Sequence, residues 1–94
     1  MKLLDHRKIE KGTLRGFVSV LLDSGLTVHD VALHERGDSR WVSLPGRPMT
    51  DSDGRVIRDE SGKTKYVPIV EITDRARRDA FGKAVWSLVE GLAS

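Results

Sequence analysis

Apolar residues recur at every second position over much of the first half of the chain, which is the spacing of β-strands. Residues 13–22, TLRGFVSVLL, form the first such run, and the Asp-Ser-Gly that follows is a turn signal. Residues 26–35, LTVHDVALHE, read as the returning strand. The apolar residues of this second run fall on even positions at first (Leu26 and Val28) and on odd positions afterwards (Val31 and Leu33). We therefore expect a β-bulge near His29 and Asp30, which would bend the strand.

The pattern becomes less regular after a second turn at residues 36–38. Residues 39–44 read as a third strand that completes a meander. Residues 45–63 are rich in Gly, Pro and charge, and they predict a long flexible loop with a short hairpin at its centre. Residues 65–72, KYVPIVEI, read as a fourth strand. Pro68 cannot donate a ladder hydrogen bond, which favours an edge or bulge position for this strand.

The last part of the chain has the period of an amphipathic helix, which we expect over residues 73–92. Thr73 or Asp74 can serve as its N-cap. Trp86 lies away from the apolar stripe. The stripe itself consists of Ala80, Phe81, Ala84, Val85, Leu88, Val89 and Leu92.

These elements predict one α+β domain over residues 1–94, without internal repeats. A twisted antiparallel sheet of about four strands is expected, with the C-terminal helix on one face and residues 1–11 as a basic N-terminal arm. A single helix leaves the other sheet face uncovered, and a 94-residue chain has a small core. We therefore expect a homodimer, because exposed apolar surface usually marks an interface. The expected interface residues are Phe17, Leu21, Trp41 and Trp86.

Composition narrows the class of protein. The chain has no cysteine, which excludes disulfides and thiolate metal sites. The first ten residues lack the apolar core of a secretory signal, and no run has the ~20 apolar residues of a membrane helix. We expect a cytoplasmic protein without a membrane partner. The net charge is only +2, but residues 1–15 carry +3 and residues 16–45 carry −2.

Candidate catalytic chemistry is sparse. Three histidines, His6, His29 and His34, are the only residues suited to general-base work or metal binding. His29 adjoins Asp30, but neighbouring side chains on a strand point to opposite faces, so a preformed pair is not expected. No nucleophile elbow, P-loop or metal-binding motif occurs. We expect no enzyme activity, metal, cofactor or small-molecule substrate.

Basic residues offer a stronger functional signal. Arginines at a helix start oppose the helix dipole, so three within four positions are a local cost without structural return. A helix start also presents N–H donors suited to phosphate. The alternative is a solvated, arginine-rich helix end beside Asp74 and Asp79. The candidate nucleic-acid contacts are Arg47, Arg55, Arg58, Lys63, Lys65, Arg75, Arg77, Arg78 and Lys83.

The chain resembles the stage V sporulation protein G (SpoVG) family over residues 12 to about 88. The resemblance lies in GTLRGFVSVLLDSGLTVHDVALHE, in WVSLPGRP and in YVPIVEITDRARRDAFGKAV, and the VHD and LPGR elements are its most specific pieces. It implies a bacterial regulator that binds preferred sites on DNA and RNA, dimerises through its sheet and selects sequence with help from the C-terminal helix region. By position, Arg47 matches the basic residue after the proline, and residues 75–83 match the basic helix start.

Two alternatives remain. A dimeric four-strand sheet with a helix is also similar to the transcriptional coactivator and Whirly type of single-strand binder, which stacks bases on aromatic side chains. This chain has five aromatic residues, several of which we expect in the core. A protein-interaction adaptor that uses Trp86 and the uncovered sheet face is the other alternative.

Overall fold

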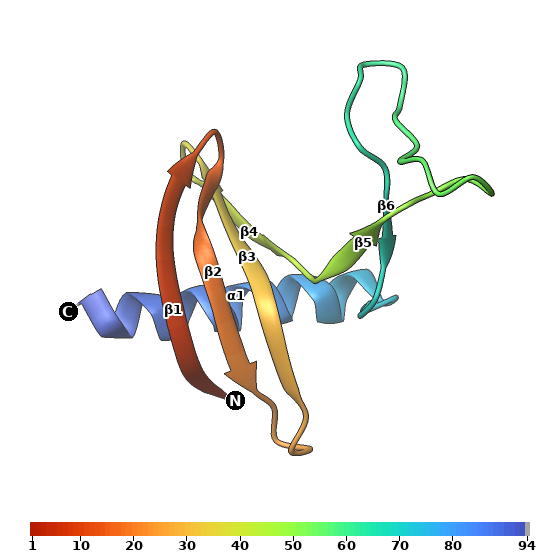
Figure 1. Ribbon diagram of the computed structural model, residues 1–94. Helices are drawn as coiled ribbons and strands as arrows, with labels where there is room; N and C mark the ends of the chain where they lie inside the picture. The colour runs from red at the N-terminus through yellow and green to blue at the C-terminus, as the bar shows by residue number, and fades with distance from the viewer. Residues whose placement is uncertain (94) are drawn as a thin grey trace.

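The computed structural model describes the backbone of residues 1–93 and the side chains of residues 1–91. Four antiparallel strands form a sheet in the order β1-β2-β3-β4, two short strands form a separate ribbon, and one helix crosses a face of the main sheet (Figure 1). The elements are β1 (Lys2–Lys11), β2 (Leu14–Leu21), β3 (Thr27–Arg36), β4 (Ser39–Ser43), β5 (Gly46–Pro48), β6 (Tyr66–Pro68) and α1 (Arg75–Ala93). The predicted α+β class, with a four-strand antiparallel sheet and a C-terminal helix, is confirmed.

The fourth strand of the sheet comes from an unexpected segment. It is β1, which pairs antiparallel with β2 and occupies the sheet edge, where we expected a basic arm. An edge strand tolerates charged side chains, and in β1 only Leu3 packs against the core. The prediction of a main-sheet strand over residues 65–72 is wrong. Within this range only Tyr66–Pro68 forms a strand, and its partner is β5.

The bulge in β3 is confirmed at the expected place. Val18 pairs with Val31 and Val20 pairs with Val28, so His29 and Asp30 together oppose one residue of β2. Asp30 has a φ of 57°, the left-handed conformation that aspartate tolerates better than most residues. The extra residue restores the parity, because Val28 and Val31 both become buried on the helix side of the sheet.

The core lies between α1 and the facing side of the sheet. It consists of Val18, Val20, Val28, Val31, Leu33, Val85 and Trp86. Trp86 is 9% exposed, whereas Ala80 and Ala84 of the predicted stripe are exposed. The helix is thus rotated from the predicted orientation, and the placement of Trp86 outside the apolar face is wrong. Burying a tryptophan removes far more apolar area from water than burying an alanine. Leu92 lies outside the described side chains.

Polar contacts attach α1 to the strand β4. The indole Nε1 of Trp86 donates to the backbone oxygen of Trp41 at 3.1 Å. The guanidinium of Arg40 lies 4.8 Å from the centre of the Trp86 ring and also forms an ion pair with Glu90. Buried indole N–H groups require such a partner. Trp86 is therefore held by its polar edge as well as by its apolar surface.

The helix begins with the N-cap that the sequence predicts. Asp74 Oδ2 accepts a hydrogen bond from the backbone N–H of Arg77 at 3.0 Å, and the Asp74 carbonyl accepts one from Arg78 at 2.9 Å. A carboxylate in this position satisfies an unpaired donor and complements the helix dipole. Of the two predicted caps, Asp74 makes these bonds.

Candidate nucleic-acid interface

The sheet face opposite α1, here called the open face, has an aromatic surface. It carries Phe17 and Leu21 of β2, because side chains of β2 alternate and Val18 and Val20 face the helix. His34 of β3 pairs with Trp41 of β4, and their rings stack with centroids 5.5 Å apart and an interplanar angle of 7°. Trp41 remains 40% exposed. Three of the four predicted interface residues thus share this face.

His34 is fixed on the open face by a second contact. Its Nδ1 lies 3.0 Å from the hydroxyl oxygen of Thr13. Burial lowers the pKa of His34 below its ordinary value because the charged imidazolium loses hydration there. The ring is therefore neutral at physiological pH and contributes a flat, uncharged surface.

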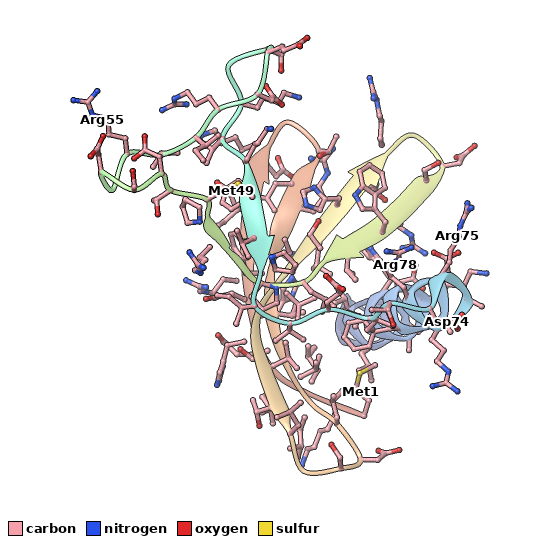
Figure 2. All side chains as sticks on the ribbon, turned by 90° about the vertical axis from the view of Figure 1, so that its right-hand side faces the viewer. Met1, Met49, Arg55, Asp74, Arg75 and Arg78 are labelled. Atoms are coloured by element: carbon pink, nitrogen blue, oxygen red, sulfur yellow. The ribbon has the colours of Figure 1, made fainter. Side chains whose placement is uncertain are left out.

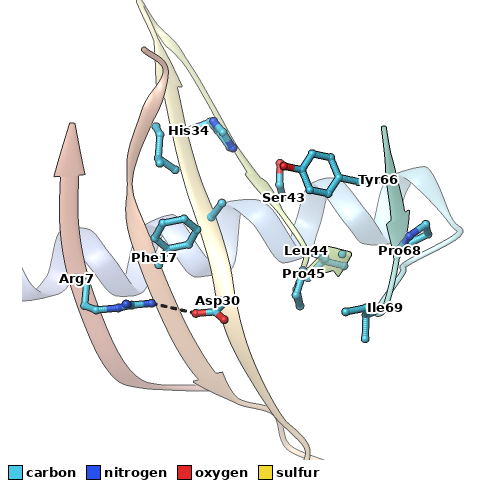
Figure 3. A pocket seen from close by; sticks show the side chains of 13 residues that line it. Arg7, Phe17, Asp30, His34, Ser43, Leu44, Pro45, Tyr66, Pro68 and Ile69 are labelled. Carbon is cyan, nitrogen blue, oxygen red and sulfur yellow. Dashed lines mark hydrogen bonds and ion pairs between the residues drawn. The ribbon is translucent and has the colours of Figure 1, made fainter. Parts of the chain in front are cut away.

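A groove of about 890 Å³ separates the open face from the β5–β6 ribbon. One ion pair lies in it, between Arg7 and Asp30 at 3.0 Å, and the Arg7 guanidinium is 5.6 Å from the centre of the Phe17 ring (Figure 3). The rest of the lining is mainly apolar and aromatic. The lining residues are Arg7, Leu14, Phe17, Asp30, Ala32, His34, Ser43, Leu44, Pro45, Gly46, Tyr66, Pro68 and Ile69.

Residues 49–65, here called the extension, continue the ribbon away from the body of the molecule (Figure 1). They contain two equivalent turns eight residues apart. Asp51 Oδ1 accepts from the backbone N–H groups of Asp53 and Arg55 at 2.9 and 3.0 Å. Asp59 Oδ1 accepts from those of Ser61 and Lys63 at the same two distances. Such Asx turns let a carboxylate take the place of a backbone acceptor.

The extension therefore contains a local repeat of hydrogen-bonded turns. The backbones of Met49, Ile57 and Lys65 are joined by three hydrogen bonds of 2.8 to 3.0 Å. Gly54 and Gly62 have φ values of 81° and 86°, which suit glycine. The expectation that the chain lacks repeats is corrected here. The signal was present as an aspartate, a glycine three positions later and then a basic residue, repeated after eight residues.

The repeat places cations at corresponding positions. Arg55 and Lys63 each follow the turn glycine and are exposed. Hydrogen bonds from the Ser61 hydroxyl and from the backbone of Lys63 lower the pKa of Asp59, because they favour the charged carboxylate. The carboxylates of both turn aspartates thus accept hydrogen bonds from backbone N–H groups. Arg47, Arg58 and Lys65, the other three predicted contacts of this segment, are exposed as well.

The predicted contacts at the helix start form a separate cluster. Arg75, Arg77, Arg78 and Lys83 are exposed, and Arg77 Nε lies 3.9 Å from Asp74 Oδ2. Arg75 and Arg78 lie beside Asp74, on the opposite side of the view from Arg55 (Figure 2). The nine basic residues that the sequence singles out therefore form two groups, one on the ribbon with its extension and one on α1.

The remaining candidates do not assemble into a catalytic or metal site. His29 Nδ1 lies 2.9 Å from the Ser19 hydroxyl oxygen, while the neighbouring Asp30 bonds to Arg7. Within the described part of the chain, no three His, Asp or Glu side chains gather as metal ligands. No helix among the described residues has the length and apolarity to cross a membrane.

The surface that remains for dimerisation is smaller than the sequence suggests. Phe17, Leu21 and Trp41 lie on the open face, but Trp86 is buried against β4 of its own chain. Leu21 is the last residue of β2, where it pairs with Thr27, and it does not line the groove. This end of the open face lies away from the groove.

Comparison with known proteins adds no relative. No family model, curated protein or solved structure matches this chain.

Proposed function

We propose that this protein is a SpoVG-like nucleic-acid-binding regulator whose extension contacts phosphates. The observation that carries the proposal is the repeated turn, which uses its own aspartates for backbone donors and presents Arg55 and Lys63 to solvent. None of the basic side chains of the ribbon or the extension forms an ion pair with a described residue. Lys and Arg side chains in this state release counterions when they bind a phosphate backbone.

The helix-start cluster supplies a second set of phosphate contacts in this proposal. Arg75, Arg77, Arg78 and Lys83 surround the beginning of α1, where the dipole also favours an anion. A dimer would double both clusters and raise the affinity for a long polyanion through multivalency. We assign its interface to the end of the open face that carries Leu21.

Salt dependence is the first test. Labelled duplex DNA, single-stranded DNA and RNA are each titrated with the protein at salt concentrations from about 50 to about 200 mM. We expect binding that weakens steeply with salt, because phosphate contacts release counterions. Absence of binding to all three nucleic acids at low salt would refute the proposal and favour the protein-interaction adaptor.

A charge-matched pair of variants localises the contacts. The double variant Arg55→Ala, Lys63→Ala should reduce the log–log salt slope on duplex DNA by about 1.8, since each phosphate contact contributes about 0.9. The control Lys8→Ala, Lys11→Ala removes the same charge from the edge strand β1. Equal losses in both variants would show that net charge alone matters, which contradicts the role of the extension. Arg75→Ala with Arg78→Ala tests the helix start in the same assay.

Light scattering at micromolar concentration tests the dimer. The expected mass is twice the 10.5 kDa of the chain. A monomer mass at that concentration would contradict the dimer while leaving the phosphate contacts to be judged by the salt titration.

A further inference from the structure

We propose that the groove between the open face and the β5–β6 ribbon accepts unpaired bases of a single-stranded nucleic acid, which stack on its aromatic side chains. This inference rests on the proposed function and adds the form of nucleic acid that the protein prefers. It assigns the phosphates to the extension and the bases to the groove.

The division of the aromatic residues is the first reason. Phe81 and Trp86 belong to the core between α1 and the sheet. Trp41 and Tyr66 are 40% and 63% exposed, and Phe17 lies half-buried on the groove floor. The core therefore needs fewer aromatic residues than the sequence suggests. Three remain on the open face or the ribbon, where exposed aromatic surface offers stacking area that is independent of base identity.

The arrangement of polar groups is the second reason. Tyr66 extends from β6 into the groove opposite Ser43 and His34, which line its sheet side (Figure 3). The hydroxyl groups of Ser43 and Tyr66 can each donate and accept a hydrogen bond. A few polar groups on aromatic walls are typical of pockets for planar ligands, and a volume of about 890 Å³ lies within their range.

Charge separates the groove from its surroundings. Among the described residues that line the groove, only Arg7 and Asp30 are charged, and they neutralise each other in an ion pair. The groove therefore attracts phosphates weakly. Two cationic residues lie next to the groove on the ribbon: Lys65 directly precedes Tyr66, and Arg47 pairs with Val67. A neutral aromatic floor next to a cationic border complements a strand whose bases turn inward and whose phosphates stay in solvent.

The shape of the groove favours this occupant over a second copy of the chain. Its two walls, the open face and the ribbon, belong to one protomer, so the site is concave. A sheet face of another protomer is four strands wide, so it would span the groove and leave it unfilled, at the cost of the lost packing contacts. A planar base is small compared with the groove volume of about 890 Å³, and it can lie against one aromatic wall.

The experiment compares two oligonucleotides with equal charge. Oligothymidine and an abasic strand of the same length have the same phosphates, but only the first has bases. We expect oligothymidine to bind more tightly and to quench the exposed Trp41, while the buried Trp86 is unaffected. Tyr66→Ala should weaken oligothymidine binding by about 5- to 150-fold, the range for one stacked base, and should leave the abasic strand unchanged.

Two control variants sharpen the result. Tyr66→Phe retains the ring and should bind almost as the unmodified protein does. Val56→Ala shortens a side chain that is 43% exposed on the extension and does not line the groove, so it should have no effect.

Three results would overturn the inference. Equal affinity for oligothymidine and the abasic strand would show that bases do not enter the groove, while phosphate binding would stand. Loss of oligothymidine affinity in Val56→Ala as large as in Tyr66→Ala would remove the assignment to Tyr66. A Tyr66→Ala variant that changes from dimer to monomer in light scattering would assign the groove to the interface between two copies. Failure of both strands to bind at low salt refutes the proposed function itself.

Discussion

Replacing Trp86 tests the orientation of α1, on which the separation of core and open face depends. Trp86→Ala removes a side chain that is 9% exposed and packs in the core. It also removes the hydrogen bond to the Trp41 carbonyl and the contact with the Arg40 guanidinium. Trp86→Phe keeps a ring but removes the N–H donor, so the two variants separate apolar burial from the polar contact.

The expected magnitudes follow from these contacts. Truncation of a buried tryptophan to alanine costs about 3–5 kcal/mol in the free energy of unfolding, because a cavity remains. In Trp86→Phe, the lost hydrogen bond accounts for about 0.5–1.5 kcal/mol. The weaker cation–π contact contributes up to about 1 kcal/mol more. Domains have a total free energy of unfolding of about 5–15 kcal/mol. Both losses are therefore measurable, and Trp86→Ala removes a large part of the free energy of unfolding.

Urea denaturation followed by far-UV circular dichroism measures both variants against the unmodified protein. We expect a lower midpoint for Trp86→Phe and a much lower one for Trp86→Ala, with unchanged slopes. A loss below about 1 kcal/mol in Trp86→Ala is typical of a surface substitution. That result would refute the burial of Trp86 and restore the helix orientation that the sequence suggested.

Two further predictions concern local geometry and pH. Gly16→Ala should destabilise the fold by about 1–3 kcal/mol, because Gly16 has a φ of 155° and an added Cβ would collide with the Arg7 carbonyl oxygen. Gly82→Ala should stabilise the fold by about 0.5–1 kcal/mol, because an added Cβ would lie at an ordinary contact distance of 3.7 Å from Val42 and alanine has the higher helix propensity. The urea midpoint should therefore fall in Gly16→Ala and rise in Gly82→Ala, and midpoints that do not move in opposite directions contradict these two predictions. Because the pKa of His34 is lowered in the folded protein, the unfolded chain binds a proton at this histidine more readily than the folded protein does. The contribution of the neutral His34 ring to the free energy of unfolding is therefore complete above pH 6.5, and it is lost as the pH falls toward the folded-state pKa. Urea midpoints between pH 7.5 and 5 should therefore decline less in His34→Gln, and an identical decline would exclude His34 as a cause.

Local patterns predicted those features that depend on neighbouring residues. The parity change in the second run correctly placed the bulge at His29 and Asp30, because burial of one sheet face requires a constant alternation. Asp74 was correctly named as a possible cap, since an N-cap bonds to an N–H only three residues away. The eight-residue repeat of the extension was equally local, and its Asp and Gly positions could have revealed the two turns.

Features that depend on distant partners were harder to predict. Residues 2–11 have too much charge to read as a strand, and they become one because β2 offers its free edge. Residues 65–72 have a strand-like composition, but Pro45 and the ribbon lead the chain away from the main sheet. β-propensity describes a fit to neighbouring strands and so does not identify which strand is the neighbour.

The sequence by itself determined the α+β class, the meander of β2 to β4, the bulge, the helix and its cap. Each of these follows from periodicity or from hydrogen bonds that close within a few residues. Only the tertiary structure decided that β1 completes the sheet, that Trp86 enters the core and that Phe17 and Tyr66 line one groove. The physical reason is that a helix with apolar residues on several sides is oriented by the volume it must fill on the sheet, which is set by residues far away in the chain.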